Sequence, residues 1–270
     1  MNLYDSIKNR RSVRTFDGKK LSEEHVNELM DYAKSVNNPY NIEIEWFILD
    51  PKENGLTSAV IVDAPLFIAG KMKRVEHAEE AFGYSFEKII LFATSLGIGT
   101  TWIAGTMNRD AFEKAVGLKE DEVMPCVSPL GYAGKKMSLR EKMMRQAIKA
   151  DKRLELSSLF FDGSFDKPLS LDDKDYLKKA CASVQLAPSA VNKQPWRVVI
   201  LDNKAFFFEK QNNGFQSKSG WDIQKIDLGI ALCHFEIGLA KEGKEAILTF
   251  DAPDIKIEEG MKYIATFLIK

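Results

Sequence analysis

The sequence contains few of the residues on which disulfide-rich and metal-binding proteins depend. It has 3 cysteines and 3 histidines among 270 residues. The cysteines, Cys126, Cys181 and Cys233, are widely spaced within apolar segments. They encode neither a disulfide framework nor a tetrahedral metal site. The default expectation is therefore a reduced, cytoplasmic setting.

The sequence also lacks an excess of charge and any long apolar run. Its 38 lysines and arginines oppose 39 acidic residues, a net charge of −1, so no global charge attracts nucleic acid or an anionic membrane. The N-terminal segment MNLYDSIKNRRSVR has no apolar core of a signal peptide. No apolar stretch approaches the roughly 18 residues of a membrane helix. We expect an ordinary globular protein of about two structural units.

Common nucleotide-binding and triad motifs are absent as well. There is no P-loop and no Gly-x-Gly-x-x-Gly after a strand, so no acidic or basic selector chooses between NADH and NADPH. His25 and His77 are expected at exposed helix positions. His234 lies in an apolar helix, where a satisfied core histidine is the better interpretation than a ligand.

What the sequence does contain is one internal repeat. Residues 21–36 align without gaps on residues 169–184, and Phe16-Asp17-Gly18 resembles Phe161-Asp162-Gly163. Ser22 and Ser170 each precede two carboxylates, a pattern typical of a capped helix start. The strands that follow align only with a gap, which indicates extra residues in the second copy between its helix and its strand.

Hydrophobic patterns predict the same elements in each copy. Strands are predicted at 44–49 and 65–69, and at 197–201 and 205–208, because these runs are rich in β-branched and aromatic residues. Long helices are predicted at 82–96 and 226–240, closing strands at 123–132 and 261–269, and a charged helix at 139–152. This order indicates an α+β sandwich of two similar lobes, residues 1–152 and 153–270.

Basic residues cluster near the N-terminus. Arg10, Arg11, Ser12 and Arg14 lie close to Lys8, and guanidinium groups with a hydroxyl can surround a phosphate. Basic runs are more often solvated surface, so this cluster alone does not establish a site.

A second cluster, residues 186–196, lies in the expected insertion of the second repeat. Pro188 and Pro195 bracket Ser189, Asn192 and Gln194, which predicts a rigid loop that displays amides. Such a loop suits the edge of a flat heteroaromatic ring. A turn whose amides satisfy local backbone groups is at least as consistent with the composition.

Two glycine-containing segments complete the set. Residues 96–105 close the first long helix, where glycines are most simply caps, although Gly105 also permits close approach of a ligand to the backbone. The segment Gly131-Tyr132-Ala133-Gly134-Lys135-Lys136, followed by Arg140, is a basic tail that the second repeat lacks.

Together these four segments resemble the FMN-dependent nitroreductase superfamily. Its members typically open with Arg-Arg-Ser-x-Arg, carry a Pro-Ser-x-x-Asn-x-Gln-Pro-Trp loop, continue with a Leu-Gly-x-Gly helix end, and finish with a Gly-Tyr strand and a basic tail. The counterparts here are residues 10–14, 188–196, 96–105 and 131–140. The resemblance implies a nitroreductase-like three-layer sandwich.

The order of the segments differs from the usual pattern. The loop normally follows soon after the Arg-Arg-Ser segment, but here Asn37-Asn38-Pro39-Tyr40 stands in that place, and the second repeat lacks both the arginine segment and the basic tail. The chain therefore resembles the tandem, two-lobed nitroreductase group, a single-chain pseudo-dimer. The resemblance implies one surviving composite site. The first lobe would supply the residues that bind the phosphate, and the second would supply the loop that contacts the flavin ring.

The resemblance also implies roles for individual residues. Arg10 and Ser12 would bind the FMN phosphate with Lys136 or Arg140; Arg11 fits a surface residue equally well. Arg14 would stabilise negative charge at flavin N1 and O2. The remaining expected cofactor contacts are Ile103, Ala104 and Gly105 near N5, and Pro188, Ser189, Ala190, Asn192 and Gln194 at the ring.

The function implied is FMN-dependent NAD(P)H oxidoreduction. Hydride would pass through flavin N5 to a small organic acceptor in a ping-pong sequence, with no metal, nucleic acid or membrane involved. The alternatives are a protein of this fold that binds flavin without turnover or binds none, and a flavoenzyme of other chemistry such as reductive dehalogenation. A monomer or a weak homo-oligomer is expected.

Overall fold

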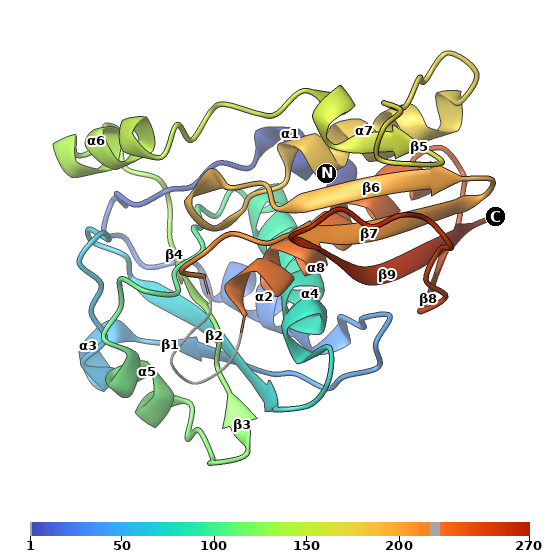
Figure 1. Cartoon of the computed structure of the whole chain (residues 1–270). Helices are drawn as coiled ribbons and strands as arrows, with labels where there is room; N and C mark the ends of the chain where they lie inside the picture. Colours follow the sequence, from blue (N-terminus) through green and yellow to red (C-terminus); the bar gives the residue numbers. More distant parts are fainter. Residues whose placement is uncertain (1, 216–221) are drawn as a thin grey trace. The chain divides into compact units, whose positions relative to one another are not determined.

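The computed structural model describes residues 2–215 and 222–270 and divides into two compact units. The first comprises residues 1–37, 41–78 and 85–150, and the second comprises 38–40, 79–84 and 151–270. Two short segments of the first predicted lobe thus belong to the second unit. Figure 1 shows the course of the chain through both.

The first unit contains six helices and four strands in its described part. In chain order they are α1 (Leu3–Asn9), α2 (Glu23–Ser35), β1 (Glu45–Leu49), α3 (Pro51–Asn54), β2 (Leu66–Lys73), α4 (Ala78–Ser95), α5 (Arg109–Ala115), β3 (Glu122–Val123), β4 (Val127–Leu130) and α6 (Leu139–Ala147). Residues 79–84 of α4 are counted with the second unit. The predicted charged helix at 139–152 is therefore shorter than expected.

The sheet of the first unit is antiparallel around β2. Strand β1 pairs with β2, with Trp46 opposite Gly70, and β4 pairs with the start of β2. Strand β3 pairs only with the end of β2, where Met72 faces Val123. The single strand predicted at 123–132 is wrong: it is interrupted after Val123, and Pro125, which has no N–H for a strand ladder, lies in the gap.

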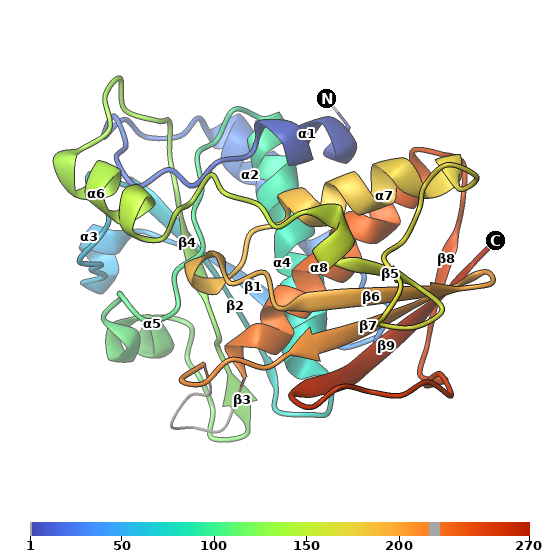
Figure 2. The same cartoon turned by 45° about the horizontal axis from the view of Figure 1, so that its top comes forward.

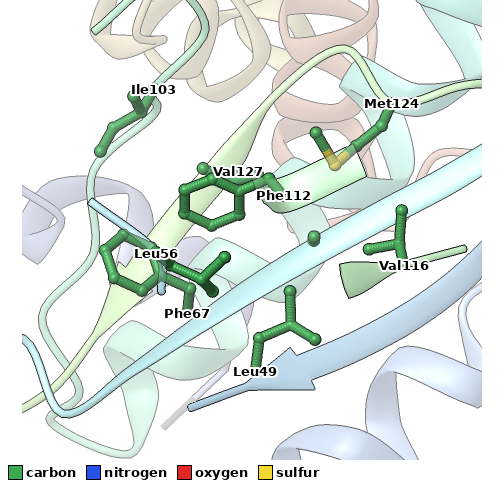
Figure 3. Close-up of a cluster of buried hydrophobic side chains, with 9 residues drawn as sticks. Leu49, Leu56, Phe67, Ile103, Phe112, Val116, Met124 and Val127 are labelled. Atoms are coloured by element: carbon green, nitrogen blue, oxygen red, sulfur yellow. The ribbon is translucent and has the colours of Figure 1, made fainter. Parts of the chain in front are cut away.

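An apolar cluster fills the space between this sheet and α5 (Figure 3). Phe67 of β2 meets Phe112 of α5 edge to face, with ring centroids 5.1 Å apart. The other buried members are Leu49, Leu56, Ala69, Ile103, Val116, Met124 and Val127. Ile103 is part of this core, so the segment that follows α4 is held by apolar packing.

The second unit contains two long helices and a five-stranded sheet in its described part. Its elements are β5 (Phe160–Asp162), α7 (Asp175–Leu186), β6 (Trp196–Leu201), β7 (Lys204–Lys210), α8 (Ile223–Ala240), β8 (Ala246–Thr249) and β9 (Met261–Ile269), with short 3-10 helices at Leu156–Ser158 and Ala190–Asn192. The strand order is β5-β6-β7-β9-β8, and only β5 and β6 are parallel.

Close helix packing organises the second unit. Figures 1 and 2 both show α7 running beside α8, and a Cβ on Gly238 would lie 2.5 Å from Ala180 Cα. His234 is fully buried, and its Nδ1 lies 2.8 Å from Ser183 O. The predicted satisfied core histidine is therefore confirmed. His25 is not exposed as predicted, because it is half-buried and its Nδ1 lies 2.9 Å from the Tyr132 hydroxyl.

The start of the second repeat differs from the prediction. Ser22 caps α2 by accepting a hydrogen bond from His25 N, but α7 begins only at Asp175, and Ser170 donates to Asp172 instead. Helix α2 ends ten residues before β1 begins, and α7 ends ten residues before β6 begins. The extra residues of the second copy thus precede its helix, and the expected insertion after the helix is wrong.

The α+β class is confirmed, as are both long helices and the strands around them. Most of the predicted helical stripes are buried, with Phe82, Phe86, Ile226 and Ile230 at most 1% exposed. These stripes predict a core position because apolar residues at helical spacing share one face.

Candidate functional site

The arginine segment of the first unit is held in an extended conformation by backbone bonds. Ser12 forms a parallel bridge with Thr100, and Val13 N–H donates to Thr100 O at 2.8 Å. On the other side, Val62 N–H donates to Arg14 O at 2.9 Å. Residues 12–14 therefore have a defined direction for each side chain, as in a β-strand.

Two glycines permit this arrangement. A Cβ at Gly99 would lie 3.0 Å from Val13 Cβ, and one at Gly131 would lie 2.7 Å from Pro65 Cδ and 2.8 Å from Phe16 Cδ1. Both positions need glycine because another chain segment approaches closely. Gly97 has φ of +75°, which fits the predicted helix cap.

Arg10 is buried beside a carboxylate. Its Nε lies 3.8 Å from Glu87 Oε1, with the side chains 6% and 0% exposed, and Glu87 Oε2 accepts a hydrogen bond from Trp102 Nε1 at 2.9 Å. Burial lowers the pKa of Arg10, and the nearby negative charge of Glu87 acts in the opposite direction. Among the described residues, Nε and Nη1 of Arg10 have no hydrogen-bond partner.

Arg14 is buried in the same way. Burial is the main cause that lowers its pKa; Glu141 raises it, and the positive charges of Arg145 and Arg10 lower it further. Its Nη1 is buried, and no described residue accepts a hydrogen bond from it. Buried guanidinium donors without acceptors are costly, so this cluster is suited to a negatively charged group.

The other basic residues predicted to bind the phosphate are exposed, unlike Arg10 and Arg14. Arg11, Lys136 and Arg140 are exposed, and Arg140 donates to the backbone carbonyl of Ala59. The sequence analysis did not find Arg145, whose charge acts on both buried arginines. Its spacing of four residues from Glu141, one helical turn, is the signal that could have identified it.

Backbone groups of residues 103–105 are largely engaged. Ile103 and Val127 exchange two N–H to O hydrogen bonds of 2.9 Å, and Ala104 O accepts from Arg109 Nη2 at 2.9 Å. Gly105 is exposed, and a Cβ on it would meet nothing within 4 Å. Within this stretch, Gly105 is the position where a ligand has room to approach.

In the second unit, the loop at 188–196 is fixed from within and from α8. Ser189 Oγ accepts from Gln194 N at 2.9 Å. Ala190 N–H donates to both carboxylate oxygens of Asp227, at 3.0 and 3.1 Å. The predicted rigid loop therefore has a physical anchor that the sequence analysis missed, since Asp227 lies 37 residues further along the chain.

The amide side chains of the loop bind the backbone of residues 152–154. Gln194 Oε1 accepts from Leu154 N at 2.9 Å, and Gln194 is 4% exposed. Asn192 Nδ2 donates to Lys152 O at 2.9 Å. These bonds agree with the interpretation of a turn that satisfies its own backbone; contact of either amide with a ring stays a prediction.

The loop backbone is strained. Val191, Asn192 and Gln194 have φ of +51°, +56° and +49°. Left-handed conformations are unfavourable for residues other than glycine, especially for β-branched ones. Strain of this kind is retained where the surroundings hold it, and it is frequent at binding sites.

Buried carboxylates lie on the elements next to this loop. Burial raises the pKa of Asp227 well above its usual range, and the charges of Asp222 and Glu209 add to the effect. Burial also raises the pKa of Glu209 to about 7, with a further contribution from Asp222. Glu209 is 1% exposed, and no described residue donates a hydrogen bond to its carboxylate. A desolvated carboxyl without a donor favours its protonated form.

Residues 2–215 and 222–270 contain neither a metal-ligand cluster nor a helix that could span a membrane. Within these ranges no group of three or more His, Cys, Asp or Glu side chains is arranged to hold a metal ion. None of the helices there has both the length and the apolar composition needed to cross a bilayer.

Comparison with known proteins gives one family match and several structural ones. The family model described as "Putative TM nitroreductase" matches residues 2–239. The crystal structure of a "putative nitroreductase" from Thermotoga maritima has a TM-score of 0.66 and 20% identity, covering 99% of this chain and 94% of that chain. The search of curated proteins gave no match.

Two further solved structures match about half of this chain. An FMN-dependent nitroreductase from Clostridium difficile R20291 has a TM-score of 0.43 and 18% identity, covering 49% of this chain and 88% of that chain. An iodotyrosine deiodinase bound to FMN and 3-iodo-L-tyrosine has a TM-score of 0.42 and 16% identity, with 51% and 92% covered. The similarity to the Thermotoga protein extends over nearly the whole of both chains and shows that they share a fold.

Proposed function

This chain belongs to the nitroreductase family described as "Putative TM nitroreductase", and we propose that it is an FMN-dependent NAD(P)H oxidoreductase. The observation that carries the proposal is the pair of buried arginines: Nε and Nη1 of Arg10 and Nη1 of Arg14 lack acceptors among the described residues. A phosphate monoester carries close to two negative charges at neutral pH. It would accept the hydrogen bonds of Arg10 and offset the burial of that cation.

The chain's own residues would bind and orient the cofactor. Arg10 and Ser12 would hold the phosphate; Lys136 and Arg140 are further contacts that the motif predicts. Arg14 would place positive charge near the pyrimidine edge of the ring. The motif assigns the ring to the loop of residues 188–196, which the bond of Ala190 N–H to Asp227 pre-organises.

When bound, FMN would supply the chemistry of hydride transfer from NAD(P)H to a small organic acceptor, in a ping-pong sequence. No side-chain acid or base of this chain needs to move a proton in that scheme. The protein's contribution is to hold the flavin and to leave one face open to donor and acceptor in turn. We propose that the monomer is sufficient, because one chain carries both sets of motifs.

A second candidate is a flavin-binding protein without reductase turnover. The observation that favours it is the Ile103 N–H, which pairs with Val127 O at 2.9 Å and so does not point its hydrogen bond at flavin N5. Gly105, exposed two residues later, would then have to supply the backbone contact near N5.

The visible absorption spectrum of the purified protein tests both candidates. The protein would be measured as isolated, after addition of FMN and desalting, and after NADPH or NADH is added without oxygen. A retained flavin band that bleaches supports the reductase. A band that persists supports the binder without turnover, and the absence of any retained band contradicts both.

A further inference from the structure

The sheet of the second unit has two outer strands, and they differ in how their free edges are treated. The strand order is β5-β6-β7-β9-β8, so β5 and β8 are the outer strands (Figure 2). Beside β5, Asp162 N–H donates to Lys167 O at 2.8 Å, and Leu169 N–H donates to Phe160 O at 3.0 Å. Pro168, between these two bonds, has no N–H to offer a further strand. The edge at β5 is therefore covered.

The backbone of β8 alternates between groups that bind β9 and groups that do not. Next to the strand, Glu245 and Lys270 exchange two N–H to O hydrogen bonds of 3.2 and 3.0 Å. Bonded positions alternate with non-bonded ones along an antiparallel pair. Ala246 lies opposite Ile269 in the register, so Ala246 is a non-bonded position, and Leu248, two residues further on, is another. The N–H and C=O groups of these two residues point away from β9.

A separate bond supports this alternation. Ile269 N–H donates to Asn203 O at 2.8 Å, so it does not bind Ala246. Within residues 2–215 and 222–270, the backbone groups of Ala246 and Leu248 have no partner on the outer side of β8. Unpaired N–H and C=O groups along an outer strand form a template for one more strand.

The side chains of β8 do not protect this edge. Ala246–Thr249 contains no proline and no charged residue, the residues that commonly keep outer strands from pairing. Ile247 is 39% exposed, and Phe250, directly after the strand, is 51% exposed. A short apolar strand of this composition favours pairing with another strand.

A second copy of β8 fits the edge in an antiparallel arrangement. With Ile247 on a two-fold axis, Ala246 of each copy lies opposite Leu248 of the other, so the outward N–H and C=O groups of both residues pair. The same arrangement brings the end that carries Lys244 beside the end of the other strand that carries Asp251, and both residues are exposed. A parallel pair in register would instead place each of these charges beside its own copy.

We propose that the chain forms a homodimer in which the β8 strands of two copies pair antiparallel about Ile247. The two five-stranded sheets then join, and the assembly closes because the β5 edge of each sheet is covered. Only four residues of each copy belong to the paired strand, so the contact is smaller than the roughly 1,200 Å² of stable complexes and the dimer is weak. The inference does not rest on flavin binding or on the proposed function, for which one chain suffices.

Sedimentation velocity at increasing protein concentration tests the inference. From micromolar to submillimolar concentration, the average mass of the wild type should rise from 30.5 kDa toward twice that value. Ile247→Lys places two like charges on the axis and should weaken the association at least about 10-fold. Leu201→Lys is the matched control, because Leu201 is 40% exposed and lies on β6, away from the β8 edge. It should associate like the wild type.

Two results of this experiment would overturn the inference. The first is a wild type that stays at 30.5 kDa over the whole range, since the edge would then be unpaired or would take a strand of another protein. The second is an association that Ile247→Lys does not weaken, or that Leu201→Lys weakens equally, because the contact would then lie elsewhere on the molecule.

Cysteine substitution tests the register. The native cysteines are at most 2% exposed, so an introduced thiol is the reactive one. Ile247→Cys places two thiols across the axis at a Cα separation of about 4.5 Å, which suits a disulfide. Copper-catalysed oxidation by dissolved oxygen, which takes up the two electrons and two protons, should link this variant into a dimer much faster than Leu201→Cys. Equal rates of linkage on a non-reducing gel would overturn the pairing about Ile247.

Discussion

The two connections between a helix and its following strand have the same length but different chemistry. The first joins α2 to β1 through residues 36–44, and the second joins α7 to β6 through residues 187–195. Both contain an asparagine with positive φ at the same distance from the strand, +55° at Asn41 and +56° at Asn192. The repeat therefore preserves the backbone path of the connection while its side chains diverge.

The side chains decide what each connection can hold. In the first, Asn38 Oδ1 accepts from Tyr40 N at 3.2 Å, and the Tyr40 ring lies 6.0 Å from that of Phe250. In the second, Gln194 binds Leu154 N, and Ala190 N–H binds the Asp227 carboxylate, both far away in sequence. The distant bonds of the second connection can retain its strained residues, Val191, Asn192 and Gln194.

The two units also bury ionisable side chains of opposite type. The first unit buries arginines whose pKa values are lowered by loss of solvent, Arg10 and Arg14. The second buries carboxyls whose pKa values are raised by the same cause, Asp227 and Glu209. The cations fit an anionic ligand, whereas the carboxyls are suited to the protonated form in which they do not repel one another.

The largest effect is expected from removing the amide that anchors the second connection. Gln194→Ala leaves the part-buried Leu154 N–H without its acceptor and opens a cavity in place of a buried side chain, so it should cost about 2 to 3 kcal/mol of stability. This lowers the melting temperature by several degrees. Glu43 holds the corresponding place before β1 and is exposed, so Glu43→Ala should change the melting temperature little. Equal losses in the two variants would contradict the asymmetry.

A smaller, pH-dependent effect is expected at Glu209. Its pKa in the folded protein, about 7, exceeds the usual value of 4.5, so the folded state holds the proton more tightly than the unfolded state. The stability that this provides is fully present below pH 4.5 and is lost as the pH rises through about 7.

In Glu209→Gln the side chain has nearly the shape of the protonated carboxyl and stays uncharged at every pH. Allowing for residual solvent screening, it should be more stable than the wild type by about 1 to 2 kcal/mol at pH 8 and equal to it at pH 4 to 5. Thermal unfolding at both pH values measures the difference, and Glu43→Gln serves as the exposed control. A variant that is destabilised at pH 8 would show that the carboxylate has a stabilising partner there.

The smallest effect concerns the strained valine. Val191 is 56% exposed, so Val191→Gly loses little packing, and relief of its left-handed conformation should outweigh the added freedom of the unfolded chain by about 0.5 to 1 kcal/mol. Asn41→Gly is the matched change in the first connection and should have almost no effect, because asparagine tolerates this conformation. Melting temperatures compare the two, and a loss of stability in Val191→Gly would show that the valine side chain holds the loop.

Several features of the site were predictable from local sequence and several were not. Arg10 and Arg14 lie together because an extended chain places alternate residues on one side. Asp227 and Arg145 were missed, since each reaches its partners only through helices that are distant in sequence. The start of α7 was also misplaced, because Ser170 and two carboxylates imitate a helix cap without forming one.

The sequence by itself indicated the repeat, the order of helices and strands, and the apolar stripes of α4 and α8. These depend on hydrophobic periodicity, capping and turn residues, which act over a few positions. Only the tertiary structure decided that Glu141 of α6 binds Thr15 beside the arginine segment, because that bond joins residues 126 positions apart. It also decided that Gln194 and Asn192 bind residues 152–154, since contacts between distant segments are set by packing and burial and leave no local pattern.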